Sequence, residues 1–98
     1  MLDREAALDT LRALLPALAT EFGVSSLAVF GSVARDEADE TSDLDLLVEF
    51  QSPVGLFEFI RLKQRLEDTF RCSVDLVEPE ALDPEARERI LKESRRAA

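Results

Sequence analysis

An alternating pattern at residues 44–50 constrains this chain more than any other feature of its sequence. Successive side chains of a β-strand point to opposite faces, so every second residue of this segment shares a face. One face is wholly apolar and consists of Leu44, Leu46, Val48 and Phe50. The opposite face consists of Asp43, Asp45, Leu47 and Glu49. The segment therefore predicts a strand with one face buried in a core and carboxylates on the other face.

The two aspartates at the start of this strand form a candidate metal site. Asp43 and Asp45 are two residues apart and share a face, so their charges repel unless one carboxyl is protonated or a cation lies between them. The chain contains no histidine, and ligation by oxygen alone favours magnesium, with manganese as an alternative, over zinc. These residues indicate a site for a hard divalent cation.

The preceding segment supplies a candidate phosphate site. Residues 24–30 are predicted to form a buried strand, which Gly31-Ser32 ends. Glycine allows the backbone to approach a ligand closely, and a helix that starts at Ser32 or Val33 would direct free N–H groups outward. A phosphate cradle beside a pair of metal-binding carboxylates suggests chemistry on a nucleoside triphosphate.

The amino-acid composition limits the classes of partner that the chain is expected to bind. The 98 residues are expected to form one domain, residues 1–98, with a formal net charge of −9. Such an acidic chain is a poor general binder of nucleic acid, because phosphate contacts need clustered lysine and arginine. No apolar run is long enough for a membrane span. The single cysteine, Cys72, excludes an internal disulfide and suits the cytoplasm.

The remaining pattern predicts a small α/β fold. Helices are expected at residues 3–22, 56–70 and from Asp83-Pro84 to about residue 94, and a third strand at residues 74–77. We expect a mixed sheet of at least three strands with helices packed on one face. Within the first helix, Pro16 is expected to kink or divide the pattern. Residues 95–98 are expected to fray.

The motif Gly31-Ser32, ten residues, Asp43-x-Asp45 resembles that of the nucleotidyltransferase superfamily, which includes DNA polymerase beta and kanamycin nucleotidyltransferase. The short chain makes it similar to the minimal nucleotidyltransferases, the MNT or MntA-like antitoxins. The resemblance extends over the helix that begins at residue 56 and over the strand Val74-Asp75-Leu76-Val77. Relatives often have glycine where this chain has Asp36, which affects the shape of the loop.

The resemblance implies that the chain transfers AMP from ATP, with magnesium, to a tyrosine of a HEPN-type toxin. Asp43 and Asp45 would hold one or two metal ions, and Asp75 would be the third metal carboxylate or the general base. Gly31 and Ser32 would hold the phosphates.

The basic residues of the helix at 56–70 offer a further candidate. They are most simply solvated, but one of them, Lys63, is a candidate contact to the triphosphate.

Two other functions stay open at this point. The same fold could neutralise a toxin by binding alone, although a pure binder has no need of clustered carboxylates. It could also be a transferase that modifies a small hydroxyl compound, although such enzymes usually carry an extra domain for the acceptor.

Overall fold

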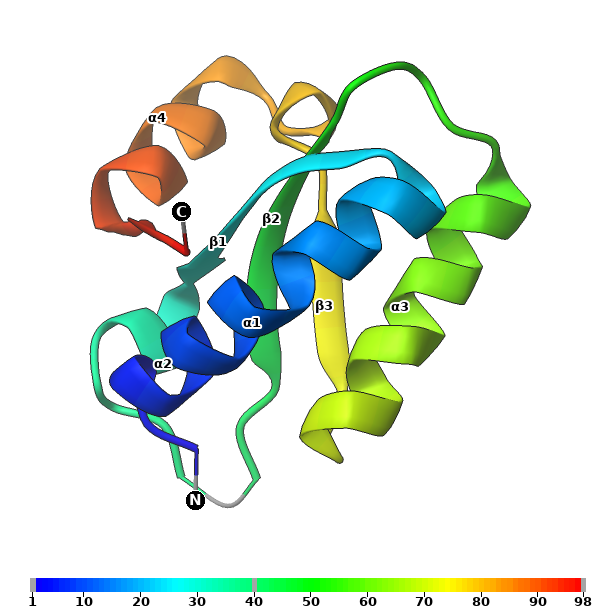
Figure 1. Cartoon of the computed structure of the whole chain (residues 1–98). Coiled ribbons are helices and arrows are strands. Elements are labelled where there is room, and N and C mark those ends of the chain that lie inside the picture. Colours follow the sequence, from blue (N-terminus) through cyan, green and yellow to red (C-terminus); the bar gives the residue numbers. More distant parts are fainter. Residues whose placement is uncertain (1, 40, 98) are drawn as a thin grey trace.

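The computed structural model describes residues 2–39 and 41–97. Figure 1 shows an α/β arrangement whose main elements follow the predicted order. Two short elements, η1 and β4, were not indicated by the sequence. The elements are α1 (Arg4–Phe22), β1 (Val24–Phe30), α2 (Gly31–Ala34), β2 (Leu44–Phe50), α3 (Leu56–Phe70), β3 (Val74–Val77), the 3₁₀-helix η1 (Pro79–Ala81), α4 (Pro84–Glu93) and β4 (Arg95–Arg96).

The four strands form one mixed sheet in the order β3-β2-β1-β4. β1 is antiparallel to both β2 and β4, whereas β2 and β3 are parallel. Helix α3 makes the crossover that a parallel pair requires. The register places Asp45 opposite Asp75 on one side and opposite Phe30, the last residue of β1, on the other. The Gly31-Ser32 turn therefore begins beside the same carboxylate.

The two long helices, α1 and α3, lie on one face of the sheet, as predicted (Figure 1). Their buried leucines, among them Leu11, Leu18, Leu62 and Leu66, share one core cluster with the strands. The apolar face predicted for β2 faces this core, with Leu44, Leu46 and Val48 at most 1% exposed. Burying one leucine contributes about 1.5–3 kcal/mol, so this cluster is the main source of stability.

Helix α4 covers part of the opposite face of the sheet, so the expectation that the helices pack on one face holds for α1 and α3 but not for α4. A smaller cluster there contains Ala28, Phe30 and Leu47, with Leu82 and Ile90 packed against it. No residue of α4 is itself buried, so the contact is thin. This incomplete cover leaves the carboxylate side of β2 and β3 accessible.

Local chemistry defines the helix ends as the sequence predicts. The carboxylate of Asp3 accepts a hydrogen bond from the Ala6 N–H at 2.7 Å, and Gly23 ends α1 with φ of 72° in the left-handed region. Asp83 caps α4 in the same way, with Pro84 in its first turn.

Pro16 does not divide α1, which continues through it. Within the described part of the chain, no helix has the length and apolar content needed to cross a membrane.

The expectation that residues 95–97 fray is wrong, and residue 98 lies outside the described residues. Arg95 and Arg96 pair with Val29 and Ala28 at the free edge of β1. Ala97 is 2% exposed, and its N–H donates to the Leu27 carbonyl at 2.9 Å. Its own carbonyl accepts from the Arg12 Nε at 2.7 Å. These contacts satisfy backbone groups that a frayed terminus would leave to water.

We predict that Ala97→Asp lowers the free energy of unfolding by at least about 2 kcal/mol, because it places a carboxylate within the main apolar core cluster. Urea unfolding followed by circular dichroism measures the effect. Ala81→Asp introduces the same charge at an exposed position and should change stability by less than about 0.5 kcal/mol. Equal effects of the two substitutions would contradict the structural role assigned to Ala97.

Candidate active site

Gly31 links β1 to α2 and lies directly against a carboxylate. Its φ of 70° is in the left-handed region, which costs an L side chain free energy. A Cβ atom built on Gly31 would overlap Oδ2 of Asp45 and lie 3.0 Å from its Cγ. Position 31 therefore requires glycine for two independent reasons, its backbone angle and the proximity of Asp45.

The parallel pairing of β2 with β3 brings two of the predicted carboxylates together. Asp45 and Asp75 are register partners on neighbouring strands, so their side chains lie on the same face. Asp43 precedes the first residue of β2 and is exposed, as is Asp75, whereas Asp45 is partly buried. The strand faces and the pairing of these residues thus follow the sequence prediction.

The environment of Asp45 favours its neutral form. Burial raises the pKa of Asp45 from 3.8 to about 6, and the charges of Asp75 and Asp43 act in the same direction. Arg35 opposes this shift in the pKa of Asp45, while Glu93 adds to it. The folded protein therefore disfavours the charged form of Asp45, and a nearby cation would relieve that cost.

Two residues at the site were missed by sequence reasoning. The carboxylate of Glu93, at the end of α4, accepts the Gly31 N–H at 3.0 Å and the Arg35 Nη1–H at 3.0 Å. Arg35 also donates through Nε to Glu37 at 3.3 Å. One signal existed in the sequence, because an acid at a helix C-terminus opposes the helix dipole. Its partner 62 positions away could not be read from the pattern.

Of the other predicted nucleotide-binding residues, Ser32 lies next to Gly31, whereas Lys63 lies away from the carboxylates. Ser32 follows Gly31 in α2, and its side chain is partly exposed. Lys63 is not brought to the carboxylates, because α3 packs on the opposite face of the sheet. Its Nζ lies 3.5 Å from the Glu67 carboxylate, which also accepts the Val74 N–H.

The acidic residues offer the oxygen donors that a hard divalent cation prefers. Their side chains are not, however, arranged as a complete set of metal ligands. Among the residues that the structure describes, no three His, Cys, Asp or Glu side chains are grouped so that they could hold a metal ion as they stand. Asp43, Asp45 and Asp75 offer only oxygen atoms, the donors that magnesium and manganese prefer. The register of β2 and β3 places Asp45 beside Asp75, and the charges of Asp75 and Asp43 both raise the pKa of Asp45.

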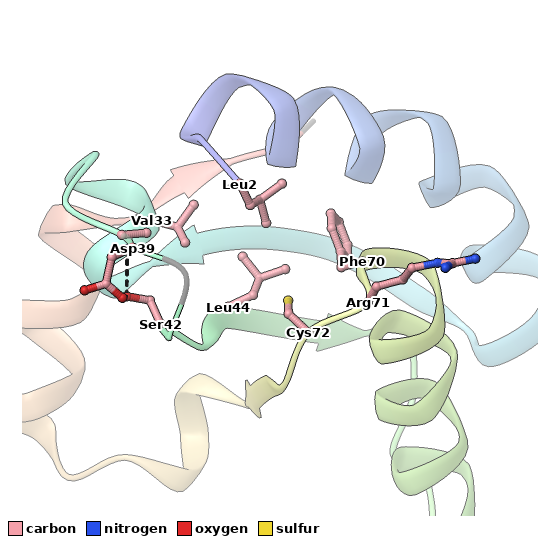
Figure 2. Close-up of a pocket in the computed structure, with 9 residues that line it drawn as sticks. Leu2, Val33, Asp39, Ser42, Leu44, Phe70, Arg71 and Cys72 are labelled. Carbon is pink, nitrogen blue, oxygen red and sulfur yellow. Dashed lines mark hydrogen bonds between the residues drawn. The ribbon is translucent and has the colours of Figure 1, made fainter.

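Figure 2 shows a cavity of about 240 Å³ whose lining includes neither Asp45 nor Asp75. Ser42 and Leu44, the neighbours of Asp43, line one wall, and Phe70 and Cys72 line another. Burial raises the pKa of the Cys72 thiol, and the charges of Asp43 and Glu67 add to the effect. The thiol is thus kept neutral, as expected of a packing residue rather than a nucleophile.

The site thus combines carboxylates on paired strands with a glycine turn against one of them. Comparison with known proteins identifies the class of protein to which the chain belongs. Residues 11–97 match the family model described as a nucleotidyltransferase domain. The chain belongs to this family, and it is an enzyme of the nucleotidyltransferase class.

Two relatives share about two fifths of their residues with this chain. A Methanocaldococcus jannaschii protein, provisionally named a protein adenylyltransferase, is 40% identical over 83 residues, covering 85% of this chain and 88% of the relative. The protein adenylyltransferase MntA of Thermococcus cleftensis is 41% identical over 76 residues, covering 78% and 77% of the two chains.

Solved structures show the same fold. One described provisionally as a minimal nucleotidyltransferase superposes with a TM-score of 0.79 at 41% identity and covers 96% of this chain and 95% of its own. A Shewanella oneidensis structure of a tri-AMPylated HEPN toxin with its MNT antitoxin matches with a TM-score of 0.70 at 16% identity, covering 97% and 71%. The second likeness concerns the fold alone.

We predict graded effects for alanine at the three glycines. Gly31→Ala should lower the free energy of unfolding by at least about 2 kcal/mol, because it strains the backbone and collides with Asp45. Gly23→Ala has the same kind of φ but open space, so it should cost about 1 kcal/mol. Gly55→Ala, at φ of −79° and also in open space, should change stability by less than about 0.5 kcal/mol, because a less flexible unfolded chain offsets the loss of glycine at the N-cap of α3.

Chemical denaturation of the three variants measures this series. A Gly31→Ala protein as stable as the Gly23→Ala protein would contradict the close contact with Asp45.

We also predict a pH dependence from the raised pKa of Asp45. The folded state binds an extra proton between about pH 4 and 6, so the Asp45 contribution to the free energy of unfolding falls as pH rises through that window. Asp45→Asn should therefore stabilise the protein relative to the unsubstituted chain at about pH 7 and have less effect at about pH 4. Urea titrations at both pH values test this, and a difference that does not change with pH would contradict it.

Proposed function

We propose that this chain transfers AMP from ATP to a tyrosine hydroxyl of a HEPN-type toxin and thereby acts as its antitoxin. The observation that carries the proposal is the pairing of Asp45 with Asp75 on adjacent strands, with the Gly31 backbone against Asp45. Relatives named protein adenylyltransferases support the reaction. The structural likeness to an MNT antitoxin supports the partner through the fold alone.

In this proposal, separate residues bind the metal ion, bind the phosphates and accept the proton. Asp43, Asp45 and Asp75 would hold magnesium, which supplies charge stabilisation to the attacking and leaving oxygens when bound. The backbone at Gly31 and Ser32 would hold the phosphates of ATP beside them. Asp75, the more exposed member of the register pair, would accept the proton of the incoming hydroxyl.

The reaction balances without any further reactant. The tyrosine oxygen forms a bond to the α-phosphorus as the bond from that phosphorus to the bridging oxygen breaks. Pyrophosphate leaves with the electrons of that bond, and the hydroxyl proton goes to a carboxylate. The product is a phosphodiester in which the AMP phosphorus joins the tyrosine oxygen to adenosine.

We predict that Asp43→Asn combined with Asp45→Asn lowers transfer by at least about a hundredfold, because it removes charges that hold the cation at the transferred phosphate. The assay measures transfer of label from α-labelled ATP, with magnesium, to a purified HEPN-type toxin candidate encoded beside this chain. Circular dichroism and urea unfolding of the double variant serve as the control for folding, because both residues lie outside the core.

Label on the toxin from the unsubstituted chain alone would support the proposal. A stable complex that gives no label would contradict the enzymatic part and favour neutralisation by binding. Loss of cooperative unfolding in the double variant would contradict the assignment of these carboxylates to the polar face.

A further inference from the structure

Glu93 joins α4 to the turn on which the candidate active site is built. One carboxylate oxygen accepts the Gly31 N–H at 3.0 Å, and the other accepts from Arg35 Nη1 at 3.0 Å. Glu37 holds the remaining side of the guanidinium at 3.3 Å. The cation of Arg35 is thus held between two carboxylates that belong to neither β2 nor β3.

The position of Glu93 is unfavourable in local terms. It is the last residue of α4, where the helix dipole disfavours a negative charge by about 0.3–1 kcal/mol. A residue that breaks a local rule in this way is expected at a functional site. Contacts on both sides fix the position of Glu93. Ile90 packs against the sheet one turn earlier, and β4 pairs with β1 two residues later.

Arg35 is a potential competitor for the same carboxylate that a metal ion would use. The positive charge of Arg35 lowers the pKa of Asp45 and so favours the ionised carboxylate. Asp45 in turn lies against Gly31, the residue whose N–H Glu93 binds. Released from Glu93, the guanidinium would have Asp45 as a nearby partner, and an arginine–carboxylate pair would occupy the oxygens that a cation needs.

We propose that Glu93 is a positioning residue of the nucleotidyl-transfer site: it holds Arg35 off Asp45 and fixes the Gly31 peptide, so that Asp45 stays available to a divalent cation. This inference rests on the proposed function, in which Asp45 is a metal ligand. It assigns to the end of α4 a part in the chemistry, although α4 contributes none of the three predicted carboxylates.

The test is a double-mutant cycle on Mn²⁺ binding, measured by the electron paramagnetic resonance signal of free Mn²⁺. Glu93→Ala should weaken binding by about tenfold, within the range of coupling in one salt-bridge network. In an Arg35→Ala background, the same substitution should change the affinity by less than about threefold, because the competing cation is absent. Glu88→Ala removes an equal charge from α4 at an exposed pair with Lys92 and should have little effect.

Two results would overturn the inference. An equal loss in both Arg35 backgrounds would show that Glu93 acts by its charge or as a ligand. Unchanged or tighter binding in Glu93→Ala would show that Glu93 does not protect the site. Thermal unfolding of each variant separates these results from misfolding.

The Asp43→Asn and Asp45→Asn double variant distinguishes failure of the inference from failure of the proposed function. If that variant binds Mn²⁺ as well as the unsubstituted chain, the metal site itself is wrong, and the inference falls with it. If the double variant loses Mn²⁺ but the cycle is additive, only the role of Glu93 is wrong.

Discussion

The parallel pairing of β2 with β3 is the interaction on which the site and much of the fold depend. Its register sets Asp45 opposite Asp75 and, by the alternation of side chains, places Leu44 and Leu46 on the core side. A shift by one residue would exchange these faces, burying the carboxylates and exposing the leucines. The leucine core therefore specifies the position of the acidic site, although it makes no contact with a substrate.

Forming the site costs folding free energy, which the rest of the chain offsets. Burial and two like charges raise the pKa of Asp45, so its ionised form is unfavourable in the folded state. The backbone turn beside it has φ of 70° and leaves no space for a side chain. Both features lie at the edge of the apolar core, where the packing of α1 and α3 supplies the stability that the turn lacks. A carboxyl group with a raised pKa is a common feature of functional sites.

The parts of the structure that follow from the sequence are those set by local pattern. The alternation in residues 44–50 predicted the faces of β2, and capping residues predicted the ends of α1 and α4. The pairing of Asp45 with Asp75 needed only the assumption that β2 and β3 are neighbours. Lys63 was a weaker inference, because a basic residue on a helix face gives no indication of which side of the sheet that face lies.

Non-local contacts explain what sequence reasoning missed. β4 contains only Arg95 and Arg96, which is too short for an alternating pattern, and its partner is the free edge of β1. Glu93 looks like one more solvated acid of α4 until the tertiary structure places it on Gly31. The partner in neither contact can be identified from the sequence, because each contact depends on a surface formed by distant segments.

The contact between Glu93 and Gly31 also bears on the order in which the molecule is completed. The two residues are 62 positions apart, and closing so long a loop costs entropy that the core must already offset. The three strands and the helices α1 and α3 precede α4 in the chain, so the main core can form while the emerging chain still lacks Glu93. We therefore expect the contact between Glu93 and Gly31 to form late in folding, after the strands that carry the site have paired.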